Sequence, residues 1–476
     1  MQAVAIIAGI VGLVWGAVIF LRGGLLGGCL IVLLAGTCFS SPFLDLQWGS
    51  VSLTVDRILW VVLIVQHAIW RLRGWADPKP PGRAELVLCG FIGLMLLSTF
   101  TADWRANGSE PAVRLVLFYL MPLGVYWVAR QSKLSERSVL TIFGCLAAFG
   151  VYLALTTVAE TYRVWWLVFP KYIVTTTTST ELEFIGRGRG PLLNPVGTGM
   201  LLALALTSAL MWWPRLKRPG RLILVILSLF FCLAIYCTLT RSAWLGGMLA
   251  FAIVLALTIP RNWRVPILGG GLLIAILVTA SQWQHVMAFK RDRNLTAQDT
   301  AESVHLRPIL AVVAWNMFLD RPLLGCGFSQ YPRECRDYLS DRSTSLPLER
   351  ARGLIPHNVL FSLLTETGLV GLGLFVILVT LWGRDAWRLW RLRSAPLWAR
   401  QQGLLFLTAM AVYFINGMFH DTSVAPMAHM TLFFLAGVTA GLRPLLQPAA
   451  EPSGTRRESS CCLPADVAPE WWSSSR

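Results

Sequence analysis

The chain has 476 residues, of which 55% are hydrophobic and only 14% are charged, and its mean hydropathy is +0.60. Soluble domains carry about a quarter of charged residues, so this composition excludes an ordinary soluble enzyme or binding module. The formal net charge of +16 would suggest a nucleic-acid partner for a soluble protein. In a membrane protein the cytoplasmic loops collect such charge, and no nucleic-acid partner is expected.

Apolar stretches recur along the chain at the length that a helix needs to cross a bilayer. They predict an all-α polytopic membrane protein with about 12 or 13 transmembrane helices, the lower number if the first two stretches form one unit. The integral membrane domain is expected over residues 1–442, and a disordered cytoplasmic tail over residues 443–476. In chain order the expected spans are 2–20, 24–40, 52–70, 85–102, 111–129, 137–158, 195–213, 221–239, 242–259, 265–283, 356–382, 401–419 and 427–442.

Basic residues gather in alternate short connections between these spans, so all of the basic connections are able to face the cytoplasm together. With an odd number of spans the N-terminus is then outside. The clusters are Arg71, Arg73, Lys79 and Arg83; Arg130, Lys133 and Arg137; Arg215, Lys217, Arg218 and Arg221; Arg261 and Arg264; and Arg384, Arg388, Arg391, Arg393 and Arg400.

Two long connections, about 159–194 and 284–355, fall on the opposite side. The second precedes the helix that begins near His357, and its residues 307–325 have helical periodicity that is expected to end at Pro322. Cys326 and Cys335 share this connection and would be able to form a disulfide in an oxidising compartment. No internal repeat supports a transporter built from duplicated halves.

Arginines on this outer side need an explanation, because the charge rule depletes them there. Arg187, Arg241 and Arg307 lie close to the boundaries of spans, where a guanidinium is costly without an anionic partner. A phosphate or pyrophosphate suits that role, because guanidinium groups bind phosphate oxygens in bidentate geometry and keep their charge. The alternative is that each side chain reaches out to lipid head groups.

His357 opens a predicted helix on the outer side, between Pro356 and Asn358, which both suit a helix start. A neutral imidazole takes a proton from a hydroxyl near pH 7. Gly368 follows about three turns later and Gly371 about one turn after that. A continuous helix would therefore present a face without side chains, for a packed helix or a lipid chain. The alternative for His357 is a helix cap or core residue without a chemical role.

Other polar residues are less strongly indicated as site residues by their neighbours in the sequence. His420 and Asp421 lie at another outer boundary and would line the same cavity, while Asp320 and Glu366 are candidate helpers. The sequence contains no Ser/His/Asp signature, Walker loop, CxxC pair or HExxH motif. No metal and no cofactor are therefore expected.

Four segments resemble motifs of the O-antigen ligase and O-antigen polymerase superfamily, which share a Wzy-type C-terminal domain. Residues 357–371 resemble its His-Asn-x9-Gly-x-x-Gly signature, and residues 187–195 resemble its Arg-x-x-Gly-x-x-x-Asn-Pro-Asn segment, with Val196 where the final Asn is usual. Residues 240–246 are similar to its Ser/Thr-Arg-x-x-x-x-Gly motif, and residues 307–331 to its Arg-x7-Trp…Pro-Leu-x-Gly-x-Gly segment.

The resemblance covers roughly residues 180–385, in the order that the family has. It implies a metal-independent glycosyltransferase of the bacterial inner (cytoplasmic) membrane with its active site on the periplasmic side. Such an enzyme moves a saccharide from an undecaprenyl-pyrophosphate donor to a hydroxyl of a lipid or glycan acceptor among the membrane lipids. The resemblance implies catalytic roles for His357, Arg241 and Arg187, and substrate binding by Arg307, Arg189, Asn194, Asn358, Gly368 and Gly371.

Four hypotheses remain open on the sequence, and the last, a merely structural membrane component, leaves the outer arginines unexplained. An O-antigen-ligase-type transferase comes first, and a polysaccharide polymerase of the same superfamily comes second, because the acceptor is chosen by variable outer loops. A transporter of bicarbonate or another small solute is less favoured, since the polar residues gather at one face and not at the membrane midplane.

Overall fold

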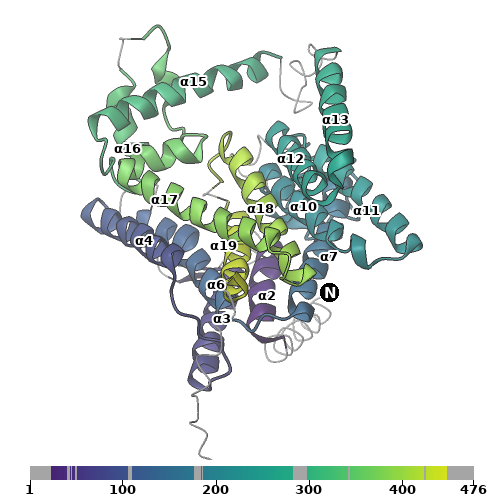
Figure 1. Cartoon of the computed structure of the whole chain (residues 1–476). Helices are drawn as coiled ribbons and strands as arrows, with labels where there is room; N and C mark the ends of the chain where they lie inside the picture. The colour runs from purple at the N-terminus through teal and green to yellow at the C-terminus, as the bar shows by residue number, and fades with distance from the viewer. Residues whose placement is uncertain are drawn as a thin grey trace, which may run out of the picture.

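The computed structural model describes residues 23–39, 43, 46–48, 51–104, 110–175, 184, 186–281, 297–340, 344–422 and 425–446. Most of this part of the chain is helical, which confirms the predicted all-α polytopic membrane class (Figure 1). Within the described residues, 7 helices are long and apolar enough to cross a membrane, and two shorter apolar helices accompany them. A small antiparallel hairpin, β1 (Leu46–Trp48) and β2 (Val51–Leu53), precedes α3.

Every span predicted from residue 24 onward coincides with a helix, and the span predicted at 2–20 lies outside the described residues. The agreement reflects a local constraint, because backbone polar groups in a bilayer must be satisfied within the segment itself. The matching helices are α2 (Gly24–Cys38), α3 (Val55–Leu72), α4 (Arg83–Thr101), α5, η1 and α6 in succession (Pro111–Leu115, Val116–Leu120, Met121–Arg130), α7 (Glu136–Thr161), α10 (Pro195–Leu210), α11 (Arg218–Cys237), α12 (Arg241–Thr258), α13 (Arg261–Ser281), α17 (Val359–Arg391), α18 (Leu397–Gly417) and α19 (Pro426–Gly441).

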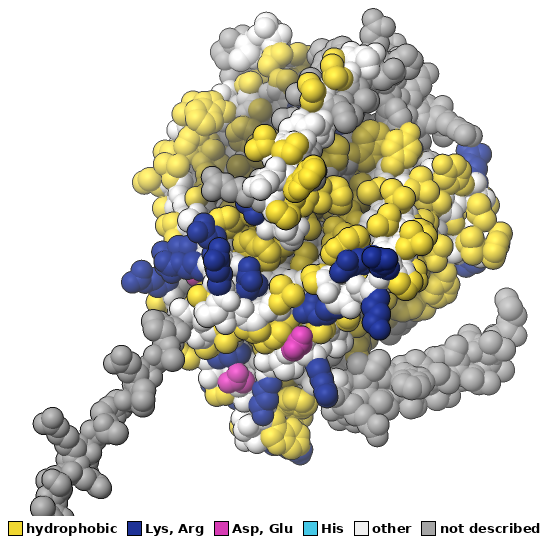
Figure 2. Space-filling view, turned by 45° about the vertical axis from the view of Figure 1, so that its right-hand side comes forward, with side chains coloured by type: hydrophobic (Ala, Val, Ile, Leu, Met, Phe, Trp, Pro, Cys, Tyr) yellow, Lys and Arg dark blue, Asp and Glu magenta, His cyan; other side chains and the backbone are white. Residues whose placement is uncertain are grey.

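Two helices form the centre of the bundle. Nearly every residue of α10 and of α19 is buried, and α19 packs against α6 while α10 packs against α7 and α12. The outer helices keep apolar side chains on the surface, as Leu222, Ile226 and Leu229 of α11 show. Figure 2 shows how far hydrophobic side chains cover one such face. An apolar exterior of this extent suits contact with lipid and not with water.

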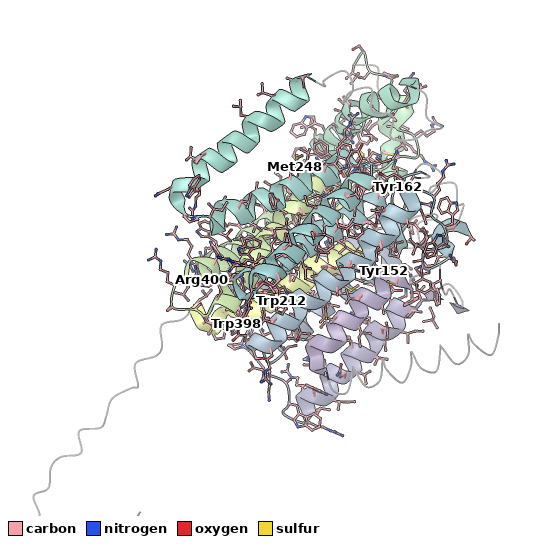
Figure 3. The ribbon with its side chains drawn as sticks, turned by 90° about the vertical axis from the view of Figure 1, so that its right-hand side faces the viewer. Tyr152, Tyr162, Trp212, Met248, Trp398 and Arg400 are labelled. Carbon is pink, nitrogen blue, oxygen red and sulfur yellow. The ribbon has the colours of Figure 1, made fainter. Side chains whose placement is uncertain are left out.

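The connections that carry the basic clusters meet at one end of the bundle, here called the basic end. Lys79 donates to the carbonyl of Arg130 at 3.1 Å, and Arg215 pairs with Glu136 at 3.7 Å. Figure 3 shows Trp212, Trp398 and Arg400 near this end, away from Tyr162 at the end of α7. The structure thus brings together the connections that the charge pattern assigned to one side. The compartment that this end faces stays a prediction.

The two long connections lie at the opposite end, here called the site end. The second contains α15 (Ala297–Asp320), which confirms the helix expected before Pro322, and the short turns α16 (Tyr331–Glu334), η4 (Cys335–Tyr338) and η5 (Leu348–Ala351). The first contains α8 (Tyr172–Thr175) and η2 (Gly190–Leu192). Cys326 and Cys335 are both free thiols, so the structure does not form the disulfide that their shared connection allowed.

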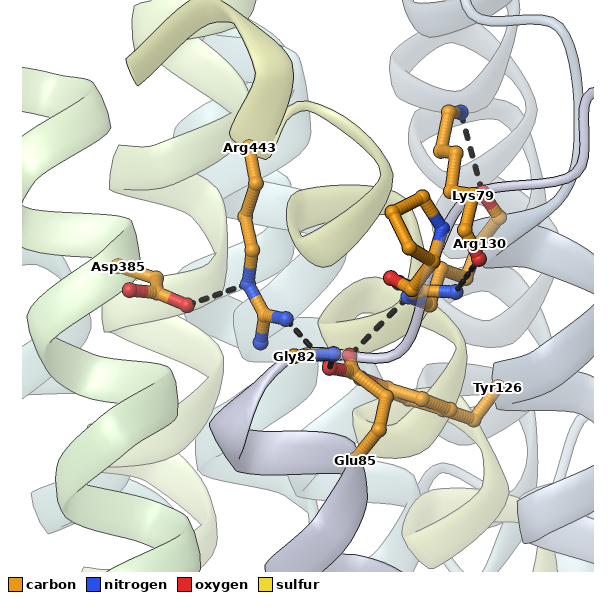
Figure 4. A network of polar contacts seen from close by, with 8 residues as sticks. Lys79, Gly82, Glu85, Tyr126, Arg130, Asp385 and Arg443 are labelled. Carbon is orange, nitrogen blue, oxygen red and sulfur yellow. Dashed lines mark hydrogen bonds and ion pairs between the residues drawn. The ribbon is translucent and has the colours of Figure 1, made fainter. Parts of the chain in front are cut away.

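A buried polar network ties the basic end together (Figure 4). Glu85 of α4, which is 1% exposed, pairs with Arg130 at 3.1 Å and with Arg443 at 2.5 Å, and accepts a hydrogen bond from the Tyr126 hydroxyl at 2.5 Å. Arg443 also pairs with Asp385 of α17 at 2.6 Å. Arg443 begins η7 (Arg443–Leu446), so the folded part extends past residue 442, while residues 447–476 lie outside the described part.

Replacing Glu85 by glutamine should lower the free energy of unfolding by about 1–3 kcal/mol, because the buried guanidinium of Arg130 and the partly buried guanidinium of Arg443 lose their shared counter-charge. The measurement is the thermal unfolding midpoint of the purified protein in detergent. Glu136→Gln is the matched control, because Glu136 is 57% exposed and its pair with Arg215 is long. The Glu136→Gln substitution should lower the free energy of unfolding by less than about 1 kcal/mol. Equal midpoints for the two variants would contradict a stabilising role of the network.

Candidate active site

A cavity of about 270 Å³ lies at the site end, between α15 and the start of α17. Arg307 and Pro308 line it from α15, and His357 and Asn358 line it from the segment that opens α17. Met418, at the end of α18, closes part of the wall. The structure therefore brings together two predicted site residues, Arg307 and His357, that lie 50 residues apart in the sequence.

Asn358 fixes the segment that carries the histidine. Its side-chain oxygen accepts hydrogen bonds from the backbone N–H groups of Leu360 at 2.8 Å and Phe361 at 3.3 Å, which caps α17. Its side-chain nitrogen donates to the carbonyl of Met418 at 3.2 Å. His357 is thereby held on a rigid helix start and stays exposed at the cavity.

His357 has a second histidine for a neighbour. The rings of His357 and His420 lie 6.4 Å apart between centroids, in an edge-to-face arrangement. The adjacent Asp421 accepts a hydrogen bond from Ser362 of α17 at 2.9 Å. His420 and Asp421 were predicted to line the same cavity as His357, but neither lines it; Asp421 lines a smaller cavity beside it.

Arg307 and Arg241 lie close enough in space for their like charges to interact. Burial, and then the like charge of Arg241, lower the pKa of Arg307 from its ordinary value. The Arg307 guanidinium also lies over the Phe419 ring, 5.3 Å from its centroid. Arg241 is the first residue of α12, where the helix dipole already adds positive charge. This concentration of positive charge next to the cavity favours an anion.

The loop that carries Arg187 is docked beside the turn that leads to Arg241. The backbone N–H of Gly188 donates to the carbonyl of Cys237, the last residue of α11, at 2.9 Å. The turn from Cys237 then reaches Arg241 within four residues. Arg187 is buried, and its guanidinium lies 5.2 Å from the centroid of the Phe184 ring. The fold thus holds the two motif arginines on segments that touch.

Two other predicted ligands hold the scaffold in this structure. The Arg189 guanidinium pairs with Glu160 of α7 at 2.8 Å and donates to the carbonyl of Ile173 at 2.6 Å. Glu160 also accepts from the backbone N–H groups of Arg189 and Gly190. Asn194 caps α10 through the N–H groups of its first turn. Both side chains therefore fix the loop that presents Arg187.

The two motif glycines do not line the cavity of His357. Gly368 interrupts α17 with φ 63° and ψ −161°, so the continuous helix that the sequence analysis assumed was wrong at this point. The backbone of the segment after Pro322 packs there, because Leu369 N–H donates to Pro322 O at 2.8 Å and Cys326 N–H donates to Thr365 O at 2.8 Å. Gly371 faces Thr367 and Leu94 of α4.

A second polar group adjoins the cavity, and sequence reasoning missed its arginine. Arg114 of α5 donates to Ser329 at 2.8 Å, and the Glu366 carboxylate accepts from the backbone N–H of Ser329. Both line a small cavity of about 20 Å³ together with Asp421 and Pro356, and Pro356 also lines the larger cavity. The available signal was an arginine at the outer start of a predicted span.

Asp320, the other candidate helper, accepts a hydrogen bond from the Tyr338 hydroxyl at 2.6 Å and holds the outer connection together. Across the described part of the chain, no three His, Cys, Asp or Glu side chains are grouped to hold a metal ion.

Two comparisons with known proteins find similarity to O-antigen ligases. A family model described as O-Antigen ligase matches residues 224–376, a segment that contains Arg241, Arg307 and His357. The chain is also 26% identical over 233 residues to an "O-antigen ligase" of Salmonella typhimurium (strain LT2), covering 47% of this chain and 55% of that protein. The alignment thus spans about half the length of this relative.

Proposed function

We propose that this membrane protein is a glycosyltransferase of the O-antigen-ligase type, and its motifs and its similarity to O-antigen ligases support this proposal. It moves a saccharide from an undecaprenyl-pyrophosphate donor to an acceptor hydroxyl. We assign the site end of the bundle to the periplasmic face of the bacterial inner membrane, since the basic end suits the cytoplasm.

The observation that carries this proposal is the cavity that presents His357 and Arg307 together, with the charge of Arg241 next to it. A group able to accept a proton and groups able to hold a diphosphate are the two components that the reaction requires. The cavity opens at the end of the bundle and not at its midplane, which favours a transferase over a transporter.

The chemistry needs one displacement. The acceptor oxygen forms a bond to the anomeric carbon of the donor saccharide while the bond from that carbon to the pyrophosphate oxygen breaks. The hydroxyl proton passes to the imidazole of His357, and the bonding electron pair leaves with the pyrophosphate. A single displacement of this kind inverts the configuration at the anomeric carbon.

Arg241 and Arg307, with Arg187 on the neighbouring loop, stabilise the charge that develops on the departing pyrophosphate. Arg241 and Arg307 lie close enough for the charge of Arg241 to lower the pKa of Arg307, so these two guanidinium groups reorganise little as the negative charge appears. Arg189 and Asn194 act as positioning residues for Arg187, and Asn358 positions His357, through the contacts described above.

The test uses the full chain in nanodiscs with a lipid-linked oligosaccharide donor and a lipid acceptor. A ligase should move one block to the acceptor, as seen by gel mobility and mass spectrometry. A ladder of lengthened, still lipid-linked products would instead assign the polymerase activity. The absence of any transfer with several donors would remove the proposal.

Arg241→Ala should lower the transfer rate by about 10²–10³-fold, because one donor to the developing anion is removed. Arg241→Lys should recover part of the rate, since it restores the charge without the bidentate geometry. The measurement is initial transfer rate at saturating acceptor. Arg350→Ala, at an exposed arginine of η5 on the same end, is the control and should retain the rate. Equal rates for Arg241→Ala and the control would contradict the role.

A further inference from the structure

A large apolar groove opens at the basic end, away from the candidate active site. It encloses about 870 Å³ between α10, α11, α12 and α18. Leu229 and Cys232 of α11, Phe251 and Leu255 of α12, and Leu404 of α18 line its walls. Leu229, Cys232 and Phe251 are exposed on the outer surface, so the groove opens sideways from the bundle toward lipid.

Four arginines surround the rim, each in contact with a residue of the groove lining. Arg400 donates to the carbonyl of Trp390 at 3.1 Å, Arg215 to the side chain of Gln401 at 2.6 Å, and Arg264 to the carbonyl of Ile259 at 2.9 Å; Arg221 lies 5.4 Å from the centroid of the Trp213 ring. Of the four, only Arg215 forms an ion pair with a described carboxylate, that of the exposed Glu136. The rim therefore carries a net positive charge.

The order of side chains along the groove matches the cross-section of one leaflet. Trp213 and Trp390 lie at the rim beside the arginines, and indole rings concentrate at membrane–water interfaces. Figure 2 shows Lys and Arg side chains in a band along the edge of a hollowed hydrophobic face. Figure 3 shows Arg400 near Trp212 and Trp398 at the same end of the helices.

We propose that this groove is a binding site for an anionic phospholipid of the leaflet at the basic end. Its hydrocarbon chains fill the apolar groove, which hydrocarbon occupies more favourably than water. Its phosphate lies among the guanidinium groups, which bind phosphate oxygens with charge-assisted hydrogen bonds. The occupant is a phospholipid because the charge lies at one end of the groove and the rest of the lining is apolar apart from Ser228, Thr258 and Gln401.

The site is separate from the proposed transfer chemistry. Arg241 begins α12 at the site end, and the helix reaches the rim at Thr258 after 18 residues. That length corresponds to about 27 Å at 1.5 Å per residue. Lipid binding and transfer are therefore separately measurable, and failure of the transferase proposal leaves this one intact.

The experiment is native mass spectrometry of the full chain, delipidated in detergent and then titrated with phosphatidylglycerol or phosphatidylcholine of identical chains. We expect one phosphatidylglycerol to be retained in preference to phosphatidylcholine. Arg221→Gln and Arg400→Gln should each weaken retention roughly fivefold, the effect of one basic residue near an anionic head group. Ser228→Phe, which fills the groove from α11, should abolish retention while the thermal unfolding midpoint stays measurable.

The matched control is Arg137→Gln, at an exposed arginine of the same end that does not line the groove. It should retain the lipid as the native chain does. Equal retention of both lipids, unchanged retention by the arginine and Ser228 variants, or replacement of phosphatidylglycerol by a polyprenyl phosphate would each overturn the proposal.

Discussion

His357→Ala is expected to lower the rate of saccharide transfer by about 10²–10⁴-fold, the usual contribution of a positioned general base. The imidazole lies exposed at a cavity that Arg307 also lines, and no other described histidine lines that cavity. The loss should appear in kcat, because the guanidinium groups that hold the donor remain. The measurement is the initial rate at saturating donor and acceptor, with donor binding followed separately by native mass spectrometry.

Asn358→Ala is the comparison for the histidine variant, because it removes the helix cap that positions His357 but keeps the imidazole itself. It should lower the free energy of unfolding by about 1 kcal/mol and reduce transfer much less than His357→Ala does. His420→Asn tests the neighbouring ring and should retain most of the rate. Undiminished transfer by His357→Ala, or a loss matched by His420→Asn, would remove the assignment of His357 as the base.

Gly368→Ala is expected to lower the free energy of unfolding by roughly 2–6 kcal/mol, from backbone strain together with overpacking. The φ of 63° with ψ −161° at Gly368 is a conformation that only glycine adopts readily. An added Cβ would also overlap the backbone of Leu323 and Leu324. Because these residues follow α15, which carries Arg307, transfer should be lost together with stability.

Gly373→Ala is the matched control within α17, since a Cβ there meets no atom within 4 Å. It should leave the thermal unfolding midpoint and the transfer rate close to the native values. The measurement is the thermal unfolding midpoint of the Gly368→Ala and Gly373→Ala proteins in the same detergent. A stable and active Gly368→Ala protein would show that the interruption of α17 at this residue is not required for the fold.

The transmembrane helices and their order were available from the sequence. The apolar stretches at 137–158 and 221–239 became α7 (Glu136–Thr161) and α11 (Arg218–Cys237), because the length and apolarity of a segment decide whether it spans a bilayer. The caps were equally local, and Asn358 caps α17 where the sequence predicted a helix start. The resemblance of the motifs that contain Arg241 and His357 to those of the O-antigen ligases was visible for the same reason, since each motif is a short run of residues.

Contacts between distant segments were decided only by the tertiary structure. The sequence treated Arg189 as a ligand, but the fold pairs it with Glu160 on another helix. It treated Gly368 as part of a continuous helical face, but its positive φ depends on the backbone that packs against it after Pro322. Periodicity along one segment carries no information about a partner on another segment, so such pairings appear only when the helices pack.

The candidate site also combines local features, which the sequence predicts, with contacts between distant segments, which only the fold sets. The sequence placed Arg241 and His357 near span boundaries, because a boundary is a property of a single span. Arg307 was also predicted there, but it lies within α15, which is not one of the described helices that are long and apolar enough to cross a membrane. Only the packing of α12, α15 and α17 places Arg307 at the same cavity as His357. The same packing brings Arg241 close enough to lower the pKa of Arg307. The physical reason is that Coulomb and hydrogen-bond energies depend on distances in space, which the order of residues along the chain does not set.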